Sequence, residues 1–96
     1  MTIIYAPRAL RELLEIETYL AERSPAGARN VLATIKPAID DLEHFPKIGV
    51  PIDAEARFRL PLRRYPYLIF YRHAAPDVFI LHIRHGARRP VEPEGL

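Results

Sequence analysis

The sequence predicts an α+β domain of two layers, in which a helical hairpin packs on an antiparallel β-sheet. Apolar residues recur with helical spacing through residues 7–43. Dense β-prone segments follow in residues 57–84. Only a few residues connect the two helical segments, which favours antiparallel helices lying side by side. The expected order of elements is strand, helix, helix, strand, strand, strand.

The length and composition limit what this protein can be. Its 96 residues suit a single domain over 1–96, with a structured part at about 2–89 and a loose tail at 90–96. It contains no cysteine, which excludes a disulfide framework, a thiolate metal site and a cysteine nucleophile. The first residues lack a signal-peptide pattern, and no apolar run approaches the ~20 residues that span a bilayer. We therefore expect a cytoplasmic protein without a cofactor.

The chain should begin with a short strand and a first helix. Thr2–Tyr5 is β-prone and short, which suits an edge strand. Pro7 fits the first turn of a helix, where its missing N–H has no partner to lose. Apolar residues then recur every three or four positions up to Leu20, so the helix should end near Glu22 or Arg23.

A second helix is predicted from Pro25 to Glu43. Ser24-Pro25 is a strong start signal, with serine as the N-cap and proline at the first helical position. Pro37 lies inside this helix and removes one backbone hydrogen bond. Because the apolar pattern continues past Pro37, we predict a kink at that point and not a break.

The next segment should be a loop followed by a half-buried strand. Phe45–Pro51 has the composition of a loop, with Phe45 expected to cap the core, and the chain should stay irregular up to Ala56. Pro61 cannot donate to a sheet ladder, so the strand that contains it should be an edge strand or carry a bulge. This strand is predicted because apolar residues alternate with arginines, namely Phe58, Leu60 and Leu62 with Arg57, Arg59 and Arg63.

A β-hairpin should form the centre of the sheet. Tyr67–His73 and Val78–Arg84 are apolar at nearly every position, which is typical of strands covered on both faces. The turn residues Ala-Ala-Pro-Asp separate them. The second of these strands is the better candidate for a central strand.

The charges are unevenly distributed along the chain. Residues 1–55 have six basic and nine acidic residues, a net charge of −3, and residues 56–96 have eight arginines and three acids, a net charge of +5. Arginine offers a planar fork that suits carboxylates and phosphates. One surface should therefore meet an acidic partner, either a nucleic acid or an acidic protein segment.

Several short pieces of the chain together carry a resemblance to a known family. They are Ala9–Leu13 with Ile16 and Tyr19, Leu42 through Phe45-Pro46 and Gly49, Arg57 with Leu60, Tyr65–Tyr71, and Ile80–Ile83 running into His85-Gly86-Ala87-Arg88. In this order and spacing they resemble the ParE/RelE superfamily of type II toxin–antitoxin toxins, over about residues 3–89. The resemblance implies one of two activities, since RelE-like members are ribonucleases that cut messenger RNA on the ribosome, and ParE-like members poison DNA gyrase without accepted catalytic residues. In both, the C-terminal segment of an antitoxin wraps the toxin.

The resemblance allows two kinds of site. If the chain is a ribonuclease, His85 would act as acid or base, with Arg59 and Arg88 on the phosphate. There is no lysine in the second half and no tyrosine after Tyr71, residues that RelE-like sites often use. Four scattered histidines without paired spacing do not form a metal site.

We therefore favour a ParE-like toxin, a binding module without catalytic residues that inhibits gyrase and is neutralised by an antitoxin. Its His-Gly-Ala-Arg ending resembles the ParE branch. The alternatives are a RelE-like ribonuclease and an inactive, antitoxin-binding relative. The expected partner-binding residues are Arg57, Arg59, Arg63, Arg64, His85, Arg88 and Arg89.

Overall fold

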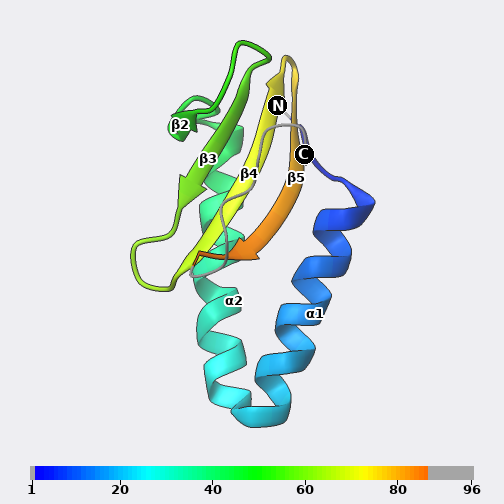
Figure 1. The fold of residues 1–96 in the computed structure, drawn as a ribbon, viewed down its shortest axis with the longest axis vertical. Helices are drawn as coiled ribbons and strands as arrows, with labels where there is room; N and C mark the ends of the chain where they lie inside the picture. Colours follow the sequence, from blue (N-terminus) through cyan, green and yellow to red (C-terminus); the bar gives the residue numbers. More distant parts are fainter. Residues whose placement is uncertain (1, 87–96) are drawn as a thin grey trace.

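A computed structural model describes residues 2–86 of the chain (Figure 1). Two antiparallel helices pack on one face of a sheet, so the predicted α+β class and helical hairpin are confirmed. Among residues 2–86, the helices lack the combination of length and apolar character that a membrane-spanning helix requires. The elements are β1 (Thr2–Tyr5), α1 (Pro7–Arg23), α2 (Pro25–Asp40), the short 3₁₀ helix η1 (Asp41–Glu43), β2 (Val50–Pro51), β3 (Arg57–Pro61), β4 (Tyr67–Ala74) and β5 (Asp77–His85).

The sheet is mixed, and not antiparallel throughout as predicted. Its strand order is β1-β5-β4-β3-β2. β1 pairs with β5 in parallel, and the other neighbours pair antiparallel. A parallel neighbour needs a long crossover, which the helical hairpin and the strands after it supply. β5 is an interior strand, but the middle position belongs to β4.

A two-residue strand that the sequence analysis missed forms one edge of the sheet. β2 pairs Val50 with Arg59 and Pro51 with Phe58. β3 is therefore interior at Phe58 and Arg59, and it becomes an edge only further along, where Pro61 pairs with Leu68 of β4. At that position the missing N–H of proline costs no ladder bond to β2, which explains how the strand tolerates Pro61.

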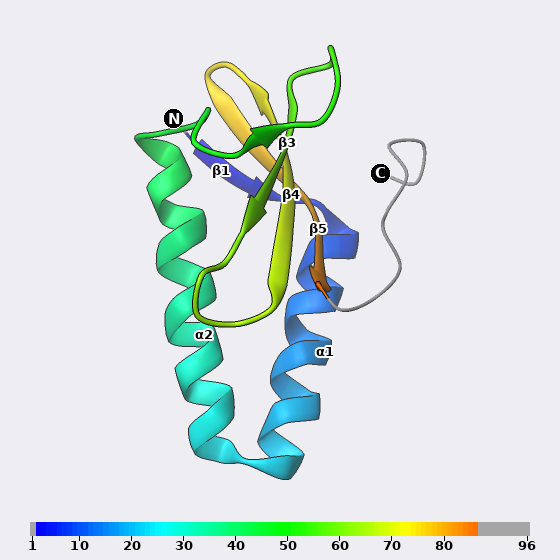
Figure 2. The same ribbon diagram turned by 60° about the vertical axis from the view of Figure 1, so that its left-hand side comes forward.

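Ser24 makes the tight connection between the helices, which lie side by side in Figure 2. Its backbone N–H donates to the carbonyl of Leu20 at 2.7 Å and so closes α1. Its hydroxyl oxygen accepts from the N–H of Gly27 at 3.0 Å and so caps α2. The second helix continues through Pro37 without a break, as predicted, but it ends at Asp40 and not at Glu43.

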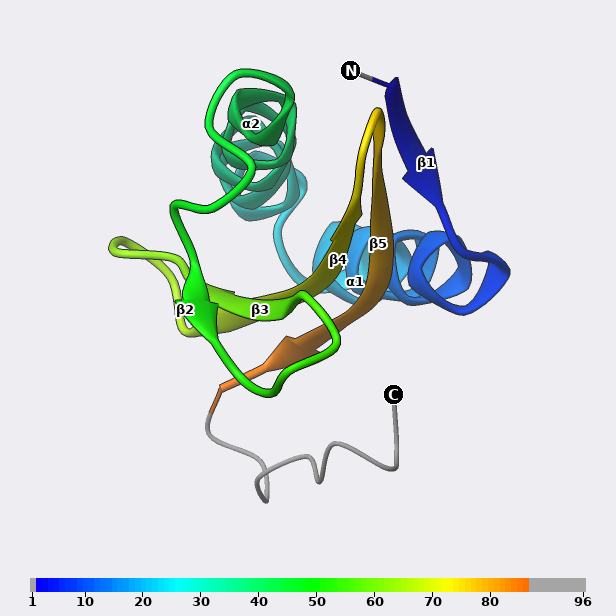
Figure 3. The ribbon, with the colours of Figure 1, turned by 90° about the horizontal axis from the view of Figure 1, so that it is seen from above.

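The core lies between the helical hairpin and the sheet. In the view from above, α2 stands to one side of the curved sheet and α1 passes behind β4 and β5 (Figure 3). Phe45 was expected to cap this core, and that prediction is wrong, because its side chain is 61% exposed on the loop after η1. Buried residues from both layers form one cluster, among them Ala9, Leu13, Val31, Ile35, Ile39, Phe58, Ile69, Tyr71, Ile80 and Ile83.

A bulge in β5 decides which side chains point toward the helices. Phe70 pairs with His82 but its neighbour Tyr71 pairs with Ile80, so Leu81 is an extra residue on β5. Simple alternation from Ile80 would send His82 and then Arg84 into the core. The extra residue reverses this order after the bulge, because side chains alternate with a period of two.

Candidate functional site

The sheet face opposite the core cluster carries four arginines, and we call it the arginine face. Cross-strand partners share a face, so the strand register gives its rows. The face is amphipathic, since apolar side chains alternate with the arginines. From β3 through β4 to β5, the rows are Arg57, Arg72 and Phe79, then Arg59, Phe70 and His82, and finally Pro61, Leu68 and Arg84.

Arg57 is neutralised by the loop that precedes its own strand. Its Nη2 lies 2.6 Å from a carboxylate oxygen of Asp53 and 3.4 Å from one of Glu55. The hydrogen bond from Arg57 is the main reason that the pKa of Asp53 is lowered, and the backbone N–H of Glu55 adds to the effect. The positive charge of Arg57 is therefore largely used within the chain.

Arg59 and Arg72 are exposed on the same face. Neither makes an ion pair with a carboxylate of residues 2–86. Arg63 and Arg64 are also exposed, but they lie on the loop between β3 and β4, where the Arg64 guanidinium stands 5.5 Å from the ring centre of Tyr65. The predicted arginine surface thus divides into a sheet part and a loop part.

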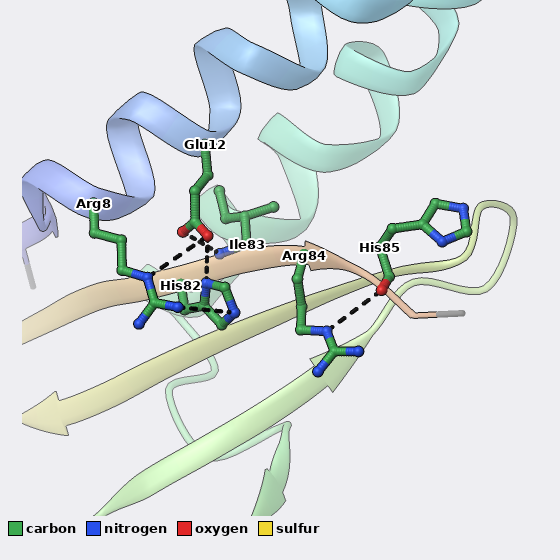
Figure 4. A network of polar contacts seen from close by, with 6 residues as sticks. All are labelled: Arg8, Glu12, His82, Ile83, Arg84 and His85. Atoms are coloured by element: carbon green, nitrogen blue, oxygen red, sulfur yellow. Dashed lines mark hydrogen bonds and ion pairs between the residues drawn. The ribbon is translucent and has the colours of Figure 1, made fainter. Parts of the chain in front are cut away.

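Arg84 and His85 project to opposite sides of β5 (Figure 4). Arg84 lies on the arginine face, and it is only 7% exposed. Its Nε donates a long hydrogen bond of 3.4 Å to the carbonyl oxygen of His85. The His85 ring instead meets the edge of Tyr67, a residue of the core, at 5.4 Å between ring centres.

The residues expected for a ribonuclease site are not gathered at one place among residues 2–86. Arg59 lies on the arginine face, and His85 lies on the side of the helices. Arg88 and Arg89, which were expected to complete the site or the partner surface, are outside the described residues. A general acid and a phosphate-binding cation must face the same reacting group, so the described pair does not form such a site.

A polar network that the sequence analysis missed joins α1 to β5 (Figure 4). One carboxylate oxygen of Glu12 accepts from the backbone N–H of Ile83 at 3.1 Å, and the other lies 2.5 Å from Nδ1 of His82. Arg8 lies 3.7 Å from the same carboxylate and 3.5 Å from Nε2 of His82. The sequence carries little signal for this network, because Glu12 lies between the apolar positions of an amphipathic helix, as a solvent-facing residue would.

This network has a clear place in the topology. β1 ends where Tyr5 pairs with Ile80, and the N–H of Ala6 still donates to the carbonyl of Ile80 at 2.9 Å. Beyond that point β5 has no neighbouring strand on its outer side within the described sheet, and α1 packs there instead. Glu12 supplies the acceptor that a further residue of β1 would have given, because an unpaired buried N–H is costly.

Within residues 2–86 we find no group of three or more side chains of the metal-ligating types. His82 is buried and stacks on Phe70, with 5.4 Å between ring centres. The chemistry that the described face offers is therefore the binding of anions by arginine.

The fold and the arginine face define a small basic α+β module suited to binding an acidic partner. The family model for the ParE toxin of the type II toxin–antitoxin system parDE matches residues 3–90. The chain belongs to this toxin family.

Named relatives agree with the family assignment. The chain is 40% identical over 79 residues to the protein Y4kP of Sinorhizobium fredii, covering 82% of this chain and 81% of the relative. It is 34% identical over 86 residues to toxin RelE2 of Caulobacter vibrioides, covering 90% and 96%.

Two solved structures share the fold. A chain of the chromosomal ParDE system of P. aeruginosa matches with a TM-score of 0.75 at 20% identity, covering 88% of this chain and 95% of that one. A chain of the intact E. coli RelBE complex matches with a TM-score of 0.64 at 17% identity, covering 92% and 98%. The chain is thus similar in fold to one chain from each of these two toxin–antitoxin systems.

Proposed function

We propose that this chain is a ParE-like toxin that inhibits DNA gyrase and is held inactive by a cognate antitoxin. One observation carries the choice between the two branches. His85 and Arg59 lie on opposite faces of the sheet, so they do not form an acid–cation pair for cutting RNA. The match to the ParE family model supports the same choice.

The antitoxin is the second part of the proposal. The two solved structures with this fold come from toxin–antitoxin systems, ParDE and RelBE. The arginine face combines exposed Arg59 and Arg72 with half-buried apolar side chains. Such a face suits an acidic, partly apolar segment of another protein. The gene of that antitoxin should lie next to the gene of this chain and encode a DNA-binding N-terminal half.

Two assays on the purified chain test the target. We expect inhibition of gyrase-driven supercoiling of a relaxed plasmid, and no cleavage of ribosome-bound message. Adding the antitoxin in equal amount should restore supercoiling, which controls for a contaminating inhibitor.

The ribonuclease alternative is kept because one relative is named RelE2. Message cleavage that His85→Ala abolishes would establish that alternative and remove the gyrase proposal. Inertness in both assays, with normal growth on expression, would identify an inactive relative that only binds antitoxin.

A further inference from the structure

Arg84 is a sheltered cation to which the described part of the chain gives almost no partner. Only 7% of this residue's surface is exposed, so its side chain is almost fully buried. A guanidinium stays charged at any physiological pH and offers five N–H donors. The one hydrogen bond of Arg84 runs from Nε to a backbone carbonyl at 3.4 Å, and no carboxylate of residues 2–86 lies within 4.0 Å of it.

The partly buried Arg57, by contrast, has its counter-ions within the chain. Its Nη2 lies 2.6 Å from a carboxylate oxygen of Asp53 and 3.4 Å from one of Glu55. Burying a charge without a counter-ion lowers stability. The unpaired, buried charge of Arg84 is best explained by a counter-ion that a partner molecule supplies.

We propose that Arg84 is the anion-binding site of the arginine face, and that its ligand is a carboxylate on an acidic, partly apolar segment of a partner protein. Arg84 shares its row with Pro61 and Leu68, and the next row contains the exposed Arg59. A carboxylate that reaches a sheltered guanidinium can form two parallel hydrogen bonds, and exclusion of water strengthens them. The proposal rests on the antitoxin partnership proposed above, but not on gyrase as the target.

A protein segment fits this face better than a nucleic acid. Proteins that hold single-stranded nucleic acid combine arginines with aromatic rings on which bases stack. On the arginine face, Phe70 is buried against His82, and Phe79 is only half exposed. The apolar neighbours Pro61 and Leu68 suit aliphatic side chains beside the carboxylate.

The first experiment compares the stability of the free chain in two variants. Arg84→Met removes an unpaired buried charge, and we expect the melting temperature to rise by about 4–8 °C. Arg57→Met removes a paired arginine and leaves Asp53 and Glu55 without their cation, so the melting temperature should fall. A fall of similar size in both variants would show that Arg84 is structural and would overturn the proposal.

The second experiment follows the arginine Nε–H signals by NMR while probes are added. The probes are the capped peptide Glu-Leu-Glu-Leu-Glu, its Gln-for-Glu counterpart and an oligothymidylate of eight nucleotides. We expect the Arg84 signal to shift with the glutamate peptide only. Arg84→Gln should weaken that binding about tenfold or more, and Arg84→Lys should weaken it less.

Arg29→Gln is the matched control for net charge. Arg29 is exposed on α2, in the opposite layer, and its loss should leave peptide binding within about twofold. A shift of the Arg84 signal with the oligonucleotide and not with the peptide would show that the site binds a nucleic acid. No shift with any probe would show that Arg84 is not an anion-binding site.

Glu92 and Glu94 lie outside the described residues. If Glu92→Gln with Glu94→Gln lowers the melting temperature and moves the Arg84 signal, the chain fills the site itself and the proposal fails.

Discussion

At the scale of single residues, one close contact fixes the register between β2, β3 and β4. The N–H of Gly49 donates to the buried hydroxyl of Tyr71 at 3.0 Å. A Cβ at position 49 would stand 2.8 Å from that hydroxyl oxygen and 3.0 Å from the carbonyl oxygen of Arg59. The ring of Tyr71 also stacks on Phe58, with 5.2 Å between ring centres. Glycine is therefore required at this position by close approach.

Gly49→Ala should destabilise the protein by about 1–3 kcal/mol, because the added methyl group overpacks a closed site. Tyr71→Phe should cost about 1–2 kcal/mol, because it leaves the buried N–H of Gly49 without its acceptor. The combined variant should lose less than the sum, since removal of the hydroxyl also removes the closest clashing atom. Urea unfolding monitored by circular dichroism measures all three, and strict additivity would contradict the proposed contact.

Two tyrosines with raised pKa values should make the free energy of unfolding fall at alkaline pH. Burial raises the pKa of Tyr71, and the Gly49 hydrogen bond offsets this only in part. Burial also raises the pKa of Tyr5, and the nearby charge of Asp40 adds to the effect. A raised pKa means that the unfolded chain ionises first as the pH increases. The free energy of unfolding should therefore be unaffected by these groups below about pH 10 and should fall above it.

The expected slope is at most about 1.4 kcal/mol per pH unit for each tyrosine. Urea unfolding between pH 8 and pH 11.5 measures it. Tyr71→Phe should show a shallower fall than the parent protein, and Tyr19→Phe, a change on the exposed side of α1, should not. Equal slopes in all three proteins would mean that other groups cause the alkaline loss.

At the scale of elements, Glu12 connects the first helix to the outer edge of β5, beyond the end of β1. Its carboxylate meets the N–H of Ile83 and the ring of His82. Glu12→Ala should destabilise the protein by about 1–3 kcal/mol, because it leaves a sheltered donor unsatisfied. Hydrogen exchange of the Ile83 amide should accelerate more than the exchange of other β5 amides. Glu15→Ala, at an exposed position of the same helix, is the control and should leave that amide unchanged.

The helices and strands also show which parts of the fold can be predicted from the sequence alone. Both helices could be predicted because their signals are local, with Pro7 at one start and Ser24-Pro25 at the other. The edge strand β2 could not, because it has two residues and one of them is Pro51. The parallel pairing of β1 was also missed. Which edge a terminal strand joins depends on contacts between distant segments, and local periodicity does not record them.

The candidate site was harder to predict than the fold, because the orientation of its residues on β5 depends on one extra residue, Leu81. The arginine pattern of β3 correctly indicated an arginine-bearing face, because strict alternation fixes the side of each residue. The sheet face on which Arg84 and His85 each lie depends on the bulge at Leu81. No local sequence pattern in this apolar strand indicates that bulge. The positions of Arg84 and His85 therefore needed the strand register.

At the scale of the whole molecule, charge is divided between the layers. The helical layer holds most of the acidic residues, and the sheet and its loops hold six of the eight arginines of the second half. An acidic partner should therefore be steered toward the sheet and away from the helices. Exposed charges act mainly on the rate of association, and their effect weakens as salt is added.

Arg59→Glu tests this steering directly, because Arg59 is exposed in the middle row of the arginine face. We expect the association rate with the antitoxin from the neighbouring gene to fall about tenfold or more at 50 mM salt, and clearly less at 300 mM. Binding kinetics on an immobilised toxin measure both rates. Arg29→Glu makes the same change in net charge on α2, so a direction-dependent field predicts a much smaller effect. Equal losses in the two variants would mean that only the net charge of the toxin matters, and that the antitoxin does not approach through the arginine face.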